Sequence, residues 1–281
     1  MASCINSIPY RLIRGSNQVD LQLRGKIALV SGSTAGIGNA IATSLAREGA
    51  RVIVNGRTPK AVDAAVAAMK SAAGGDVMGF AGDLSSASVA EKLLQLHPQV
   101  DILVNNLGIF EVKAFEDITD AEWLRFFDVN VLSGARLARL YLPFMRKRNW
   151  GRIIFISSES GYQIPAEMIH YGMTKAAQIA VARGLAEATA GTGITVNSVL
   201  PGPTRSRGVA DFVADWAAKS GKSAQTVEDE FFKTARPTSL IKRFATPEEV
   251  AAMVTFVASP LSAATNGAAL RVDGGVVKTA F

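Results

Sequence analysis

Two side chains that could exchange a proton lie four residues apart in the middle of the chain, Tyr171 and Lys175. They fall in the run from 166 to 190, which predicts one long helix, so they share a helical face one turn apart. A free phenol has a pKa of about 10, and a fixed cation nearby lowers it. The pair could therefore act as a general acid and base, although this spacing also occurs in helices without catalytic function.

A serine at a predicted strand end extends this candidate site. The run from Arg152 to Ser157 has the apolar character of a buried strand, and Ser158 ends it. A strand-end serine and a residue one turn into the following helix can meet above a parallel sheet. Ser158 could then hydrogen-bond a carbonyl oxygen that Tyr171 protonates.

An asparagine in an apolar stretch is the fourth candidate. Asn130 lies between two valines in a predicted helix from Thr119 to about Arg148, which starts with a capping box. An amide in such surroundings needs a buried partner or a water. Two interpretations stay open, an amide satisfied by nearby backbone and an amide that belongs to the site.

A glycine-rich turn follows the first predicted strand, which runs from Lys26 to Ser31, and a helix ending near Gly49 follows the turn. Glycines let the backbone approach a pyrophosphate closely, and a helix N-terminus offers free amide donors. Glycine turns also cap helices that bind nothing, but the strand–turn–helix context favours a dinucleotide-binding loop. The residues of this predicted loop are Gly32, Ser33, Thr34, Gly36, Ile37 and Gly38.

The tip of the second predicted strand, Arg51 to Asn55, bears on the choice of cofactor. In dinucleotide folds an acidic residue here binds the ribose 2′-hydroxyl, whereas a basic one accommodates a 2′-phosphate. This chain has Asn55, Gly56 and Arg57 and no acid at this tip. Arg57 therefore favours a 2′-phosphate; the alternative is a solvent-exposed loop arginine.

Two further strand ends carry polar residues. Asp83 follows the strand from Val77 to Ala81 and either caps a helix or binds an adenine amino group. The strand from Val100 to Val104 leads into Asn105 and Asn106, whose side-chain amides can tie neighbouring loops together.

Strands and helices alternate from Lys26 to the end of the chain. Further strands are predicted from Ile194 to Leu200, before Pro201, and from Ala268 to Val272. This order predicts an α/β protein with one doubly wound parallel sheet of about seven strands and helices on both faces. We expect one domain over residues 25–281 and an N-terminal extension, partly flexible, over residues 1–24.

The stretch from 204 to 240 interrupts this alternation. It is irregular and amphipathic and carries aromatic side chains, including Phe212 and Trp216. Two interpretations stay open, a lid over a substrate and ordinary core helices.

Composition narrows the class of protein. The chain has 281 residues, one cysteine, two histidines and a net charge of +6. We expect no metal site, no disulfide framework and a reducing, cytoplasmic location. No apolar run reaches the roughly 18 residues that span a bilayer. The positive charge is mostly spread out, so we expect no nucleic-acid partner.

Several motifs together resemble the short-chain dehydrogenase/reductase family. The glycine loop resembles its cofactor loop, and Asn105-Asn106-Leu107-Gly108 resembles its Asn-Asn-Ala-Gly motif, with Leu107 in place of alanine. Leu107 puts bulk near the cofactor. Asn130, Ser158, Tyr171 and Lys175 fall where the family has its catalytic tetrad. Pro201-Gly202 and Val272-Asp273-Gly274-Gly275 match two further signatures, so the resemblance covers about Leu23 to Gly275.

The resemblance implies a Rossmann fold and a mechanism. A hydride passes between NADPH and a carbonyl carbon while Tyr171 donates the proton. Lys175 lowers the pKa of Tyr171 and holds the nicotinamide ribose, Ser158 orients the carbonyl, and Asn130 holds a water that links Lys175 to solvent. Beyond the glycine loop, Asn55 and Arg57, the resemblance places at the cofactor Asp83, Leu84, Asn106, Gly108, Tyr171, Lys175, Pro201, Gly202, Thr204 and Ser206.

The substrate is open within this class. The residues expected to line its pocket are Glu159, Tyr162, Gln163, Met168, His170, Phe212 and Trp216. A carrier-protein acyl thioester is one candidate, because Arg148 lies where 3-oxoacyl reductases have a basic docking residue, but a second basic position is Thr192 here. A small ketone, a sugar or a steroid-like alcohol is equally allowed.

We expect an enzyme that uses NADP(H) in preference to NAD(H) and assembles as a homodimer or homotetramer. The alternatives are an NAD-dependent alcohol dehydrogenase of the same family and a non-catalytic dinucleotide-binding sensor or scaffold. The sensor is disfavoured because such proteins usually lose part of the tetrad.

Overall fold

A computed structural model of the chain describes residues 19–280, without the side chains of Arg207, Asp211 and Phe212. Within this range seven parallel strands form one sheet in the order β3-β2-β1-β4-β5-β6-β7. The predicted doubly wound sheet is therefore confirmed. The strands are β1 (Ile27–Val30), β2 (Arg51–Gly56), β3 (Val77–Ala81), β4 (Ile102–Asn105), β5 (Gly151–Ile156), β6 (Ile194–Pro201) and β7 (Ala269–Val272).

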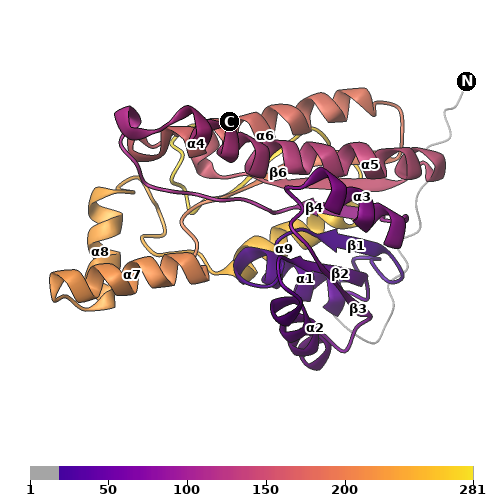
Figure 1. Ribbon diagram of the computed structural model, residues 1–281, viewed down its shortest axis with the longest axis horizontal. Helices are drawn as coiled ribbons and strands as arrows, with labels where there is room; N and C mark the ends of the chain where they lie inside the picture. The colour runs from indigo at the N-terminus through magenta and orange to yellow at the C-terminus, as the bar shows by residue number, and fades with distance from the viewer. Residues whose placement is uncertain (1–18, 281) are drawn as a thin grey trace, which may run out of the picture.

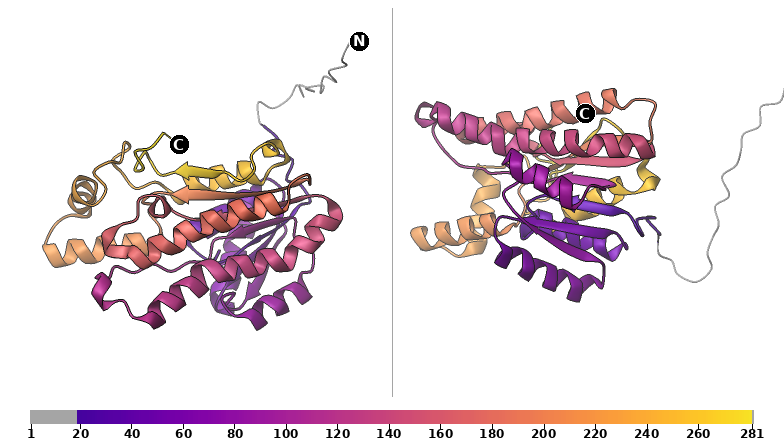
Figure 2. Two further views of the ribbon diagram at one scale, coloured as in Figure 1. Left: turned by 90° about the horizontal axis from the view of Figure 1, so that it is seen from above. Right: turned by 45° about the vertical axis from the view of Figure 1, so that its right-hand side comes forward.

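Helices cover both faces of the sheet, as Figure 1 shows, and a second view from above separates the layers (Figure 2). One face carries α3 (Ala87–Leu96), α4 (Asp120–Phe127), α5 (Ser133–Arg148) and α6 (Ile169–Ala188). The other carries α1 (Gly36–Arg47), α2 (Pro59–Ala73) and α9 (Pro247–Ala258). Each face has its own hydrophobic cluster.

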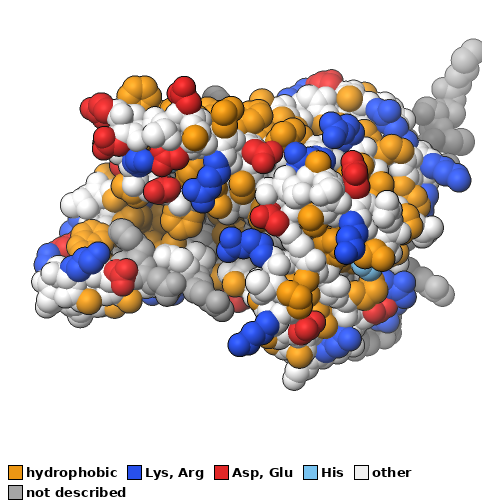
Figure 3. All heavy atoms as spheres, in the orientation of Figure 1, with side chains coloured by type: hydrophobic (Ala, Val, Ile, Leu, Met, Phe, Trp, Pro, Cys, Tyr) orange, Lys and Arg blue, Asp and Glu red, His pale blue; other side chains and the backbone are white. Residues whose placement is uncertain are grey.

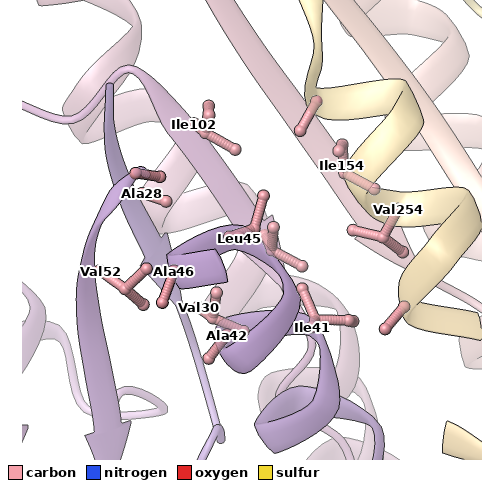
Figure 4. Packing of buried hydrophobic residues seen from close by; sticks show 14 of the residues in the cluster. Ala28, Val30, Ile41, Ala42, Leu45, Ala46, Val52, Ile102, Ile154 and Val254 are labelled. Atoms are coloured by element: carbon pink, nitrogen blue, oxygen red, sulfur yellow. The ribbon is translucent and has the colours of Figure 1, made fainter. Parts of the chain in front are cut away.

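The central strands are apolar on both faces because both are covered by helices. In β5 and β6 every residue is buried. On one face Leu45 and Ile41 of α1 meet Val254 of α9 and Ile154 of β5 (Figure 4). This packing holds the glycine turn, which starts α1, rigidly above the sheet.

The strand order reverses direction at β1, which pairs with β2 on one side and β4 on the other. In open α/β sheets, ligands bind in the crevice beyond the carboxyl ends of the strands at such a switch point. In this chain the glycine turn follows β1, and the Asn105–Gly108 stretch continues from the end of β4.

The predicted helix from Thr119 to Arg148 is interrupted once. Between α4 and α5 the residues Asp128–Leu132 form a π turn. An extra residue in a turn rotates the following side chains relative to a regular helix, and such turns are frequent at functional sites. Asn130 lies inside it and is fully buried.

The stretch from 204 to 240 forms two helices that project from the body at the left of Figure 1, α7 (Arg207–Ser220) and α8 (Ala224–Thr234). We call residues 204–245 the arm. It has a separate hydrophobic cluster of Val213, Val227, Phe232 and Phe244, against which Trp216 also packs. The two helices pack on each other and not on the sheet, unlike ordinary core helices; the role as a lid stays a prediction.

The last residues of the expected N-terminal extension, from Leu21 on, already pack on the body of the protein. Leu23 is fully buried in the core, and the Leu21 carbonyl accepts a hydrogen bond from Ser259 Oγ at 2.8 Å. Residues 1–18 lie outside the described range. Between residues 19 and 280 no helix is long and apolar enough to cross a membrane, and no group of three or more His, Cys, Asp or Glu could hold a metal ion.

Candidate active site

The glycine turn after β1 is shaped by close backbone packing. Gly32 and Gly36 have positive φ angles of 61° and 57°. A Cβ at Gly38 would lie 2.5 Å from both Asn106 Nδ2 and the Gly32 carbonyl oxygen. Asn106 Nδ2 donates to the carbonyls of Ser31 and Gly32, each at 3.0 Å. Asn106 therefore ties the stretch after β4 to the turn after β1.

Two residues expected to bind cofactor have side chains that hold the glycine turn in shape. Asn55 is buried; its Oδ1 accepts from Gly32 N at 3.1 Å, and its Nδ2 donates to the carbonyls of Phe80 and Gly82 at 3.2 and 3.0 Å. Ser33 is also buried and donates through Oγ to the Val30 carbonyl at 2.7 Å. Their polar side-chain atoms are engaged with backbone, so they set the shape of the turn.

Leu84 and Asp83 also differ from the expectation. Leu84 is 1% exposed and belongs to the core, so its side chain does not flank an adenine. Asp83 is exposed and its carboxylate accepts from the backbone N and the hydroxyl of Ser85 at 3.0 and 2.7 Å. Asp83 therefore closes a turn and does not cap α3, whose N-cap is Ser86; the contact to an adenine amino group stays a prediction.

A cavity of about 610 Å³ opens between the glycine turn and α2. A Cβ at Gly56, the tip of β2, would lie 2.4 Å from Thr34 Cγ2, so Thr34 fills the space beside this tip. The cavity combines helix N-termini, small side chains and an ammonium, which fits the adenosine end of a dinucleotide. Its lining residues are Thr34, Ala35, Gly36, Asn39, Thr58, Lys60, Ala61, Ala64, Ala65 and Ala68.

Ser158 and Tyr171 meet above the end of β5, as their positions in the sequence predicted. The Ser158 hydroxyl lies near enough to the phenol of Tyr171 to lower its pKa, and it donates to Glu159 Oε2 at 2.5 Å. Burial and the Glu159 carboxylate raise the pKa of Tyr171, while Ser158 and the charge of Arg236 lower it. The net shift is upward, so the expected lowering by Lys175 is absent from this structure.

Lys175 points toward the sheet, which accounts for that difference. Its ammonium donates to the Ile156 carbonyl at 2.9 Å and to Gln178 Oε1 at 3.0 Å. It lies 5.5 Å from the centre of the Tyr171 ring. Burial lowers the pKa of Lys175 to about 7. A Cβ at Gly108 would lie 3.5 Å from Lys175 Nζ, so the stretch after β4 reaches the same point.

The Asn130 side chain is held mainly by backbone, and Gln178 connects Asn130 to Lys175. Asn130 Oδ1 accepts from Ile109 N at 2.8 Å, and its Nδ2 donates to the Ile109 carbonyl at 3.0 Å and to Thr174 Oγ1 at 2.9 Å. Its backbone carbonyl accepts from Gln178 Nε2 at 2.6 Å. The backbone of Ile109 satisfies most of the amide, as the first interpretation expects; a role of Asn130 in the site stays a prediction.

Known proteins share this architecture. A family model described as enoyl-(acyl carrier protein) reductase matches residues 32–277. The uncharacterized oxidoreductase YvaG of Bacillus subtilis (strain 168) is 49% identical over 262 residues, which cover 93% of this chain and 99% of that relative. The chain belongs to the short-chain dehydrogenase/reductase family. It is an oxidoreductase that acts on carbonyl and alcohol groups.

Two further members of the family have named substrates. D-beta-hydroxybutyrate dehydrogenase of Cupriavidus necator is 36% identical over 260 residues, covering 91% of this chain and 99% of that protein. The structure of L-sorbose reductase from Gluconobacter frateurii, complexed with NADPH and L-sorbose, superposes with a TM-score of 0.88 at 30% identity. It covers 93% of this chain and 100% of that chain.

In this short-chain dehydrogenase/reductase the outer part of the site is a cavity of about 450 Å³. Arg236 of the arm enters it and pairs with Glu159 Oε1 at 3.1 Å and with Glu167 Oε1 at 3.6 Å. Figure 3 shows this face hollowed between the arm and the body, with apolar side chains inside. The cavity is lined by Gln163, Ile164, Pro165, Glu167, Thr234, Ala235 and Arg236.

Some of the residues expected in the substrate pocket lie at this cavity and others do not. Gln163 lines the cavity, Tyr162 is half exposed nearby in the chain, and Glu159 is buried behind Arg236. The expectation for His170 is wrong: its ring is 1% exposed and lies 4.0 Å from the ring of Phe126, inside the helical layer. Met168 is partly exposed just before α6, Trp216 packs in the arm cluster, and the Phe212 side chain lies outside the described part.

Sequence reasoning missed three residues of the site. Phe110 lies edge-on to Tyr171 at 6.3 Å between ring centres, and a Cβ at Gly208 of α7 would lie 3.5 Å from its ring. Arg236 and Gln178 are the other two. Phe110 comes two residues after the Asn105–Gly108 motif, a position that could have drawn notice; Arg236 and Gln178 carry no spacing signal.

The turn after β6 brings the arm over the glycine turn. A Cβ at Gly202 would lie 2.6 Å from the Asp273 carbonyl oxygen, so the Pro201-Gly202 and Val272-Asp273 signatures pack on each other. Thr204 is buried and donates to the Gly202 carbonyl at 2.9 Å. Ser206 Cβ lies 3.4 Å from the Cβ position of Gly36, which places the start of α7 against the start of α1.

Two remaining side chains turn away from their expected roles. Leu107 packs against the α3–α5 side of the core and beside Gly32, so its bulk goes into the core. Arg148 Nη1 lies 3.1 Å from Oδ1 of the buried Asp101. This ion pair gives Arg148 a structural role that does not depend on a docked partner.

Proposed function

We propose that this protein is an NADP(H)-dependent reductase of small, neutral, hydroxyl-bearing carbonyl compounds. The observation that carries the proposal is the convergence of Ser158, Tyr171 and Lys175 beside a glycine turn whose neighbouring strand tip has basic residues and no acid. In this proposal the three groups act as one proton-handling unit beyond the carboxyl ends of the strands.

A nicotinamide dinucleotide bound along the glycine turn would supply the hydride for the carbonyl carbon. Tyr171 gives its proton to the carbonyl oxygen, and Lys175 offers a positive charge that favours the resulting phenolate. Ser158 has one hydroxyl proton, which it donates to Glu159 Oε2 in this structure. To hydrogen-bond the substrate oxygen, that hydroxyl must turn away from Glu159, whose Oε2 keeps donors from the backbone N and hydroxyl of Ser160.

The basic residues around the tip of β2 support a preference for NADP(H). Arg57 is exposed directly after β2, and Lys60 lines the cavity from the first turn of α2. Gly56 cannot carry a carboxylate without displacing Thr34, since even a Cβ there would lie 2.4 Å from Thr34 Cγ2. A 2′-phosphate would gain two cations, whereas a 2′-hydroxyl would lack its usual acid.

The charge of the outer cavity supports a neutral substrate. Arg236, the cation that lines it, already faces two carboxylates, Glu159 and Glu167. The two carboxylates already balance the charge of Arg236, so a carboxylate or phosphate group of a substrate would find no net positive charge there. Hydroxyl groups could bind the exposed amide and hydroxyl side chains there, Gln163 and Thr234. The similarity to a reductase complexed with L-sorbose agrees with this choice.

The second candidate is an NAD-dependent alcohol dehydrogenase, favoured by the identity of 36% to D-beta-hydroxybutyrate dehydrogenase. Calorimetry with NADPH and NADH separates the two. We expect Arg57→Ala and Lys60→Ala each to weaken NADPH binding about 10- to 100-fold and NADH binding little, because each loses a charged hydrogen bond. Lys70→Ala, an exposed cation at the far end of α2, is the matched control. Equal losses for both cofactors would contradict the NADP(H) assignment.

Catalysis is tested with Tyr171→Phe on a panel of ketoses, small ketones, 3-hydroxy acids and a 3-oxoacyl thioester. We expect NADPH affinity within about twofold of the parent and turnover at least about a hundredfold lower. Tyr141→Phe is the control, because its buried hydroxyl has no hydrogen-bond partner among the described residues. Tight NADPH binding without turnover of any panel member by the parent would favour the sensor, and turnover of the thioester alone would favour acyl-chain chemistry.

A further inference from the structure

We propose that Gln178 is a positioning residue of this site, whose side-chain amide joins the Lys175 ammonium to the Asn130 carbonyl and so fixes the ammonium. This inference rests on the proposed function. The resemblance implies that Asn130 holds a water that links Lys175 to solvent. In the structure the Gln178 side chain joins Lys175 and Asn130 directly, and Gln178 belongs to none of the family motifs named above.

The contacts of Gln178 leave its amide one orientation. Gln178 is 1% exposed. Lys175 Nζ can only donate, so it faces Gln178 Oε1 at 3.0 Å, and the Asn130 carbonyl can only accept, so it faces Gln178 Nε2 at 2.6 Å. A flipped amide would bring donor to donor and acceptor to acceptor. The two neighbours therefore define the geometry of Gln178 without ambiguity.

The position of Asn130 makes this link rigid. Asn130 lies in the π turn, and its side chain is bound on both sides to Ile109 and to Thr174 of α6. Gln178 and Lys175 lie one turn apart on α6. The link therefore spans two helical segments, and a change in either would reach Lys175 through one amide.

The ammonium depends on this amide because its other partner is also neutral. Lys175 donates to the Ile156 carbonyl and to Gln178, so no carboxylate offsets its buried charge directly. An acceptor on the ammonium favours the charged form against burial. An amide does not pass on protons as a water does, so Gln178 holds the charge in place rather than relaying a proton.

Most charged groups around Lys175 are paired with other side chains. On α6, Tyr171 lies one turn from Lys175, His170 packs against Phe126, and Arg183 pairs with Glu187. The Glu159–Gly161 turn packed against α6 carries Glu159, paired with Arg236. The π turn carries Asp128, 3.5 Å from Arg136, α4 carries Glu122, bound to Lys113, and the turn before α6 carries Glu167, near Arg236. β5 carries Arg152 at its opposite end, and β6 carries no titratable side chain.

Two substitutions should move the titration of Lys175 in opposite directions. Gln178→Leu removes the acceptor and should shift it to lower pH, whereas Gln178→Glu puts a carboxylate beside the ammonium and should shift it to higher pH, each by about one unit. From the starting pKa of about 7, the downward shift reduces the charged fraction at pH 7 about fivefold. A merely structural role would not produce opposite shifts.

The experiment measures NADPH affinity by fluorescence and turnover of the best panel substrate, both from pH 5.5 to 9.5, for the parent and both variants. We expect affinity and kcat of Gln178→Leu to fall about fivefold at pH 7, with the limb of the profile moved to lower pH, and the limb of Gln178→Glu moved to higher pH. Arg183→Gln, an exposed residue of α6 paired with Glu187, is the control.

Superimposable profiles for the parent and both variants would overturn the inference, as would shifts of the same sign. Loss of the cooperative thermal transition in both variants would assign Gln178 a structural role and overturn it as well. A parent that binds no dinucleotide would instead refute the proposed function, and the two failures are therefore distinguishable.

Discussion

The ion pair between Arg236 and Glu159 provides a quantitative test of the active-site geometry. The side chains are 11% and 5% exposed, and Glu159 also accepts from Ser158 and Ser160. Arg236→Met keeps the unbranched stem of the side chain and removes the guanidinium with its charge. Glu159 would then be a buried carboxylate with hydrogen bonds only to neutral groups.

The expected cost follows from that burial. Removing one partner of a buried pair typically costs about 3–5 kcal/mol, because the remaining charge stays desolvated. Since Glu159 keeps its donors from Ser158 and Ser160, we expect the lower end, about 3 kcal/mol in the free energy of unfolding. Arg243 offers a matched comparison: it pairs with Glu249 at 2.7 Å, but the two side chains are 50% and 42% exposed. Arg243→Met should cost much less than Arg236→Met, because water screens an exposed ion pair.

Urea unfolding followed by circular dichroism, at one protein concentration, measures both losses. The double variant Glu159→Gln with Arg236→Met should recover at least about 1 kcal/mol relative to Arg236→Met alone, since it removes the stranded charge. Equal losses for Arg236→Met and Arg243→Met would refute the reasoning, because they would show that the Arg236 pair is no more desolvated than a surface pair.

Three further predictions concern neighbouring parts of the site. Because burial lowers the pKa of Lys175 to about 7 from 10.5, the unfolded chain binds more protons between these values, and the stability of the parent should rise with pH there. The free energy of unfolding of Lys175→Met should exceed that of the parent by on the order of 4 kcal/mol at pH 6, and the two should become equal near pH 10. Urea unfolding at each pH measures this difference, and a difference that does not change with pH would contradict the buried ammonium. Gly56→Ala should weaken NADPH binding and lower the free energy of unfolding by about 1–3 kcal/mol, since its Cβ would lie 2.4 Å from Thr34 Cγ2. Adding Thr34→Ser should reverse both effects, as calorimetry and urea unfolding would measure. If it reverses neither, the clash with Thr34 is excluded. Phe110→Ala should raise KM about tenfold with little loss of stability, because its 57% exposed ring contacts Tyr171 and Gly208; an unchanged KM would remove Phe110 from the pocket.

The fold was accessible from the sequence because buried parallel strands are continuous apolar runs. The predicted strand from Arg51 to Asn55 is observed as Arg51–Gly56. The glycine turn could be predicted as well, since its close contacts require glycine at Gly38. The π turn at Asn130 could not, because the insertion of one residue into a helical turn leaves the local apolar pattern almost unchanged.

The side-chain network around the site was largely beyond sequence reasoning. Arg236 and Glu159 are 77 positions apart in the chain, and no local pattern connects them. Side-chain direction was a second difficulty, as His170 and Leu84 lie at suitable positions in the chain but point into the core. Asn55 shows a third, since a polar residue beside a binding loop can serve the loop rather than the ligand.

The separate hydrophobic cluster of the arm has an evolutionary consequence. Val213, Val227, Phe232 and Phe244 pack with one another and not in either cluster of the sheet. Substitutions in α7 and α8 can therefore accumulate without loosening the layer that holds Tyr171 and Lys175. A lineage built this way can change what it accepts as substrate while it inherits its proton chemistry intact.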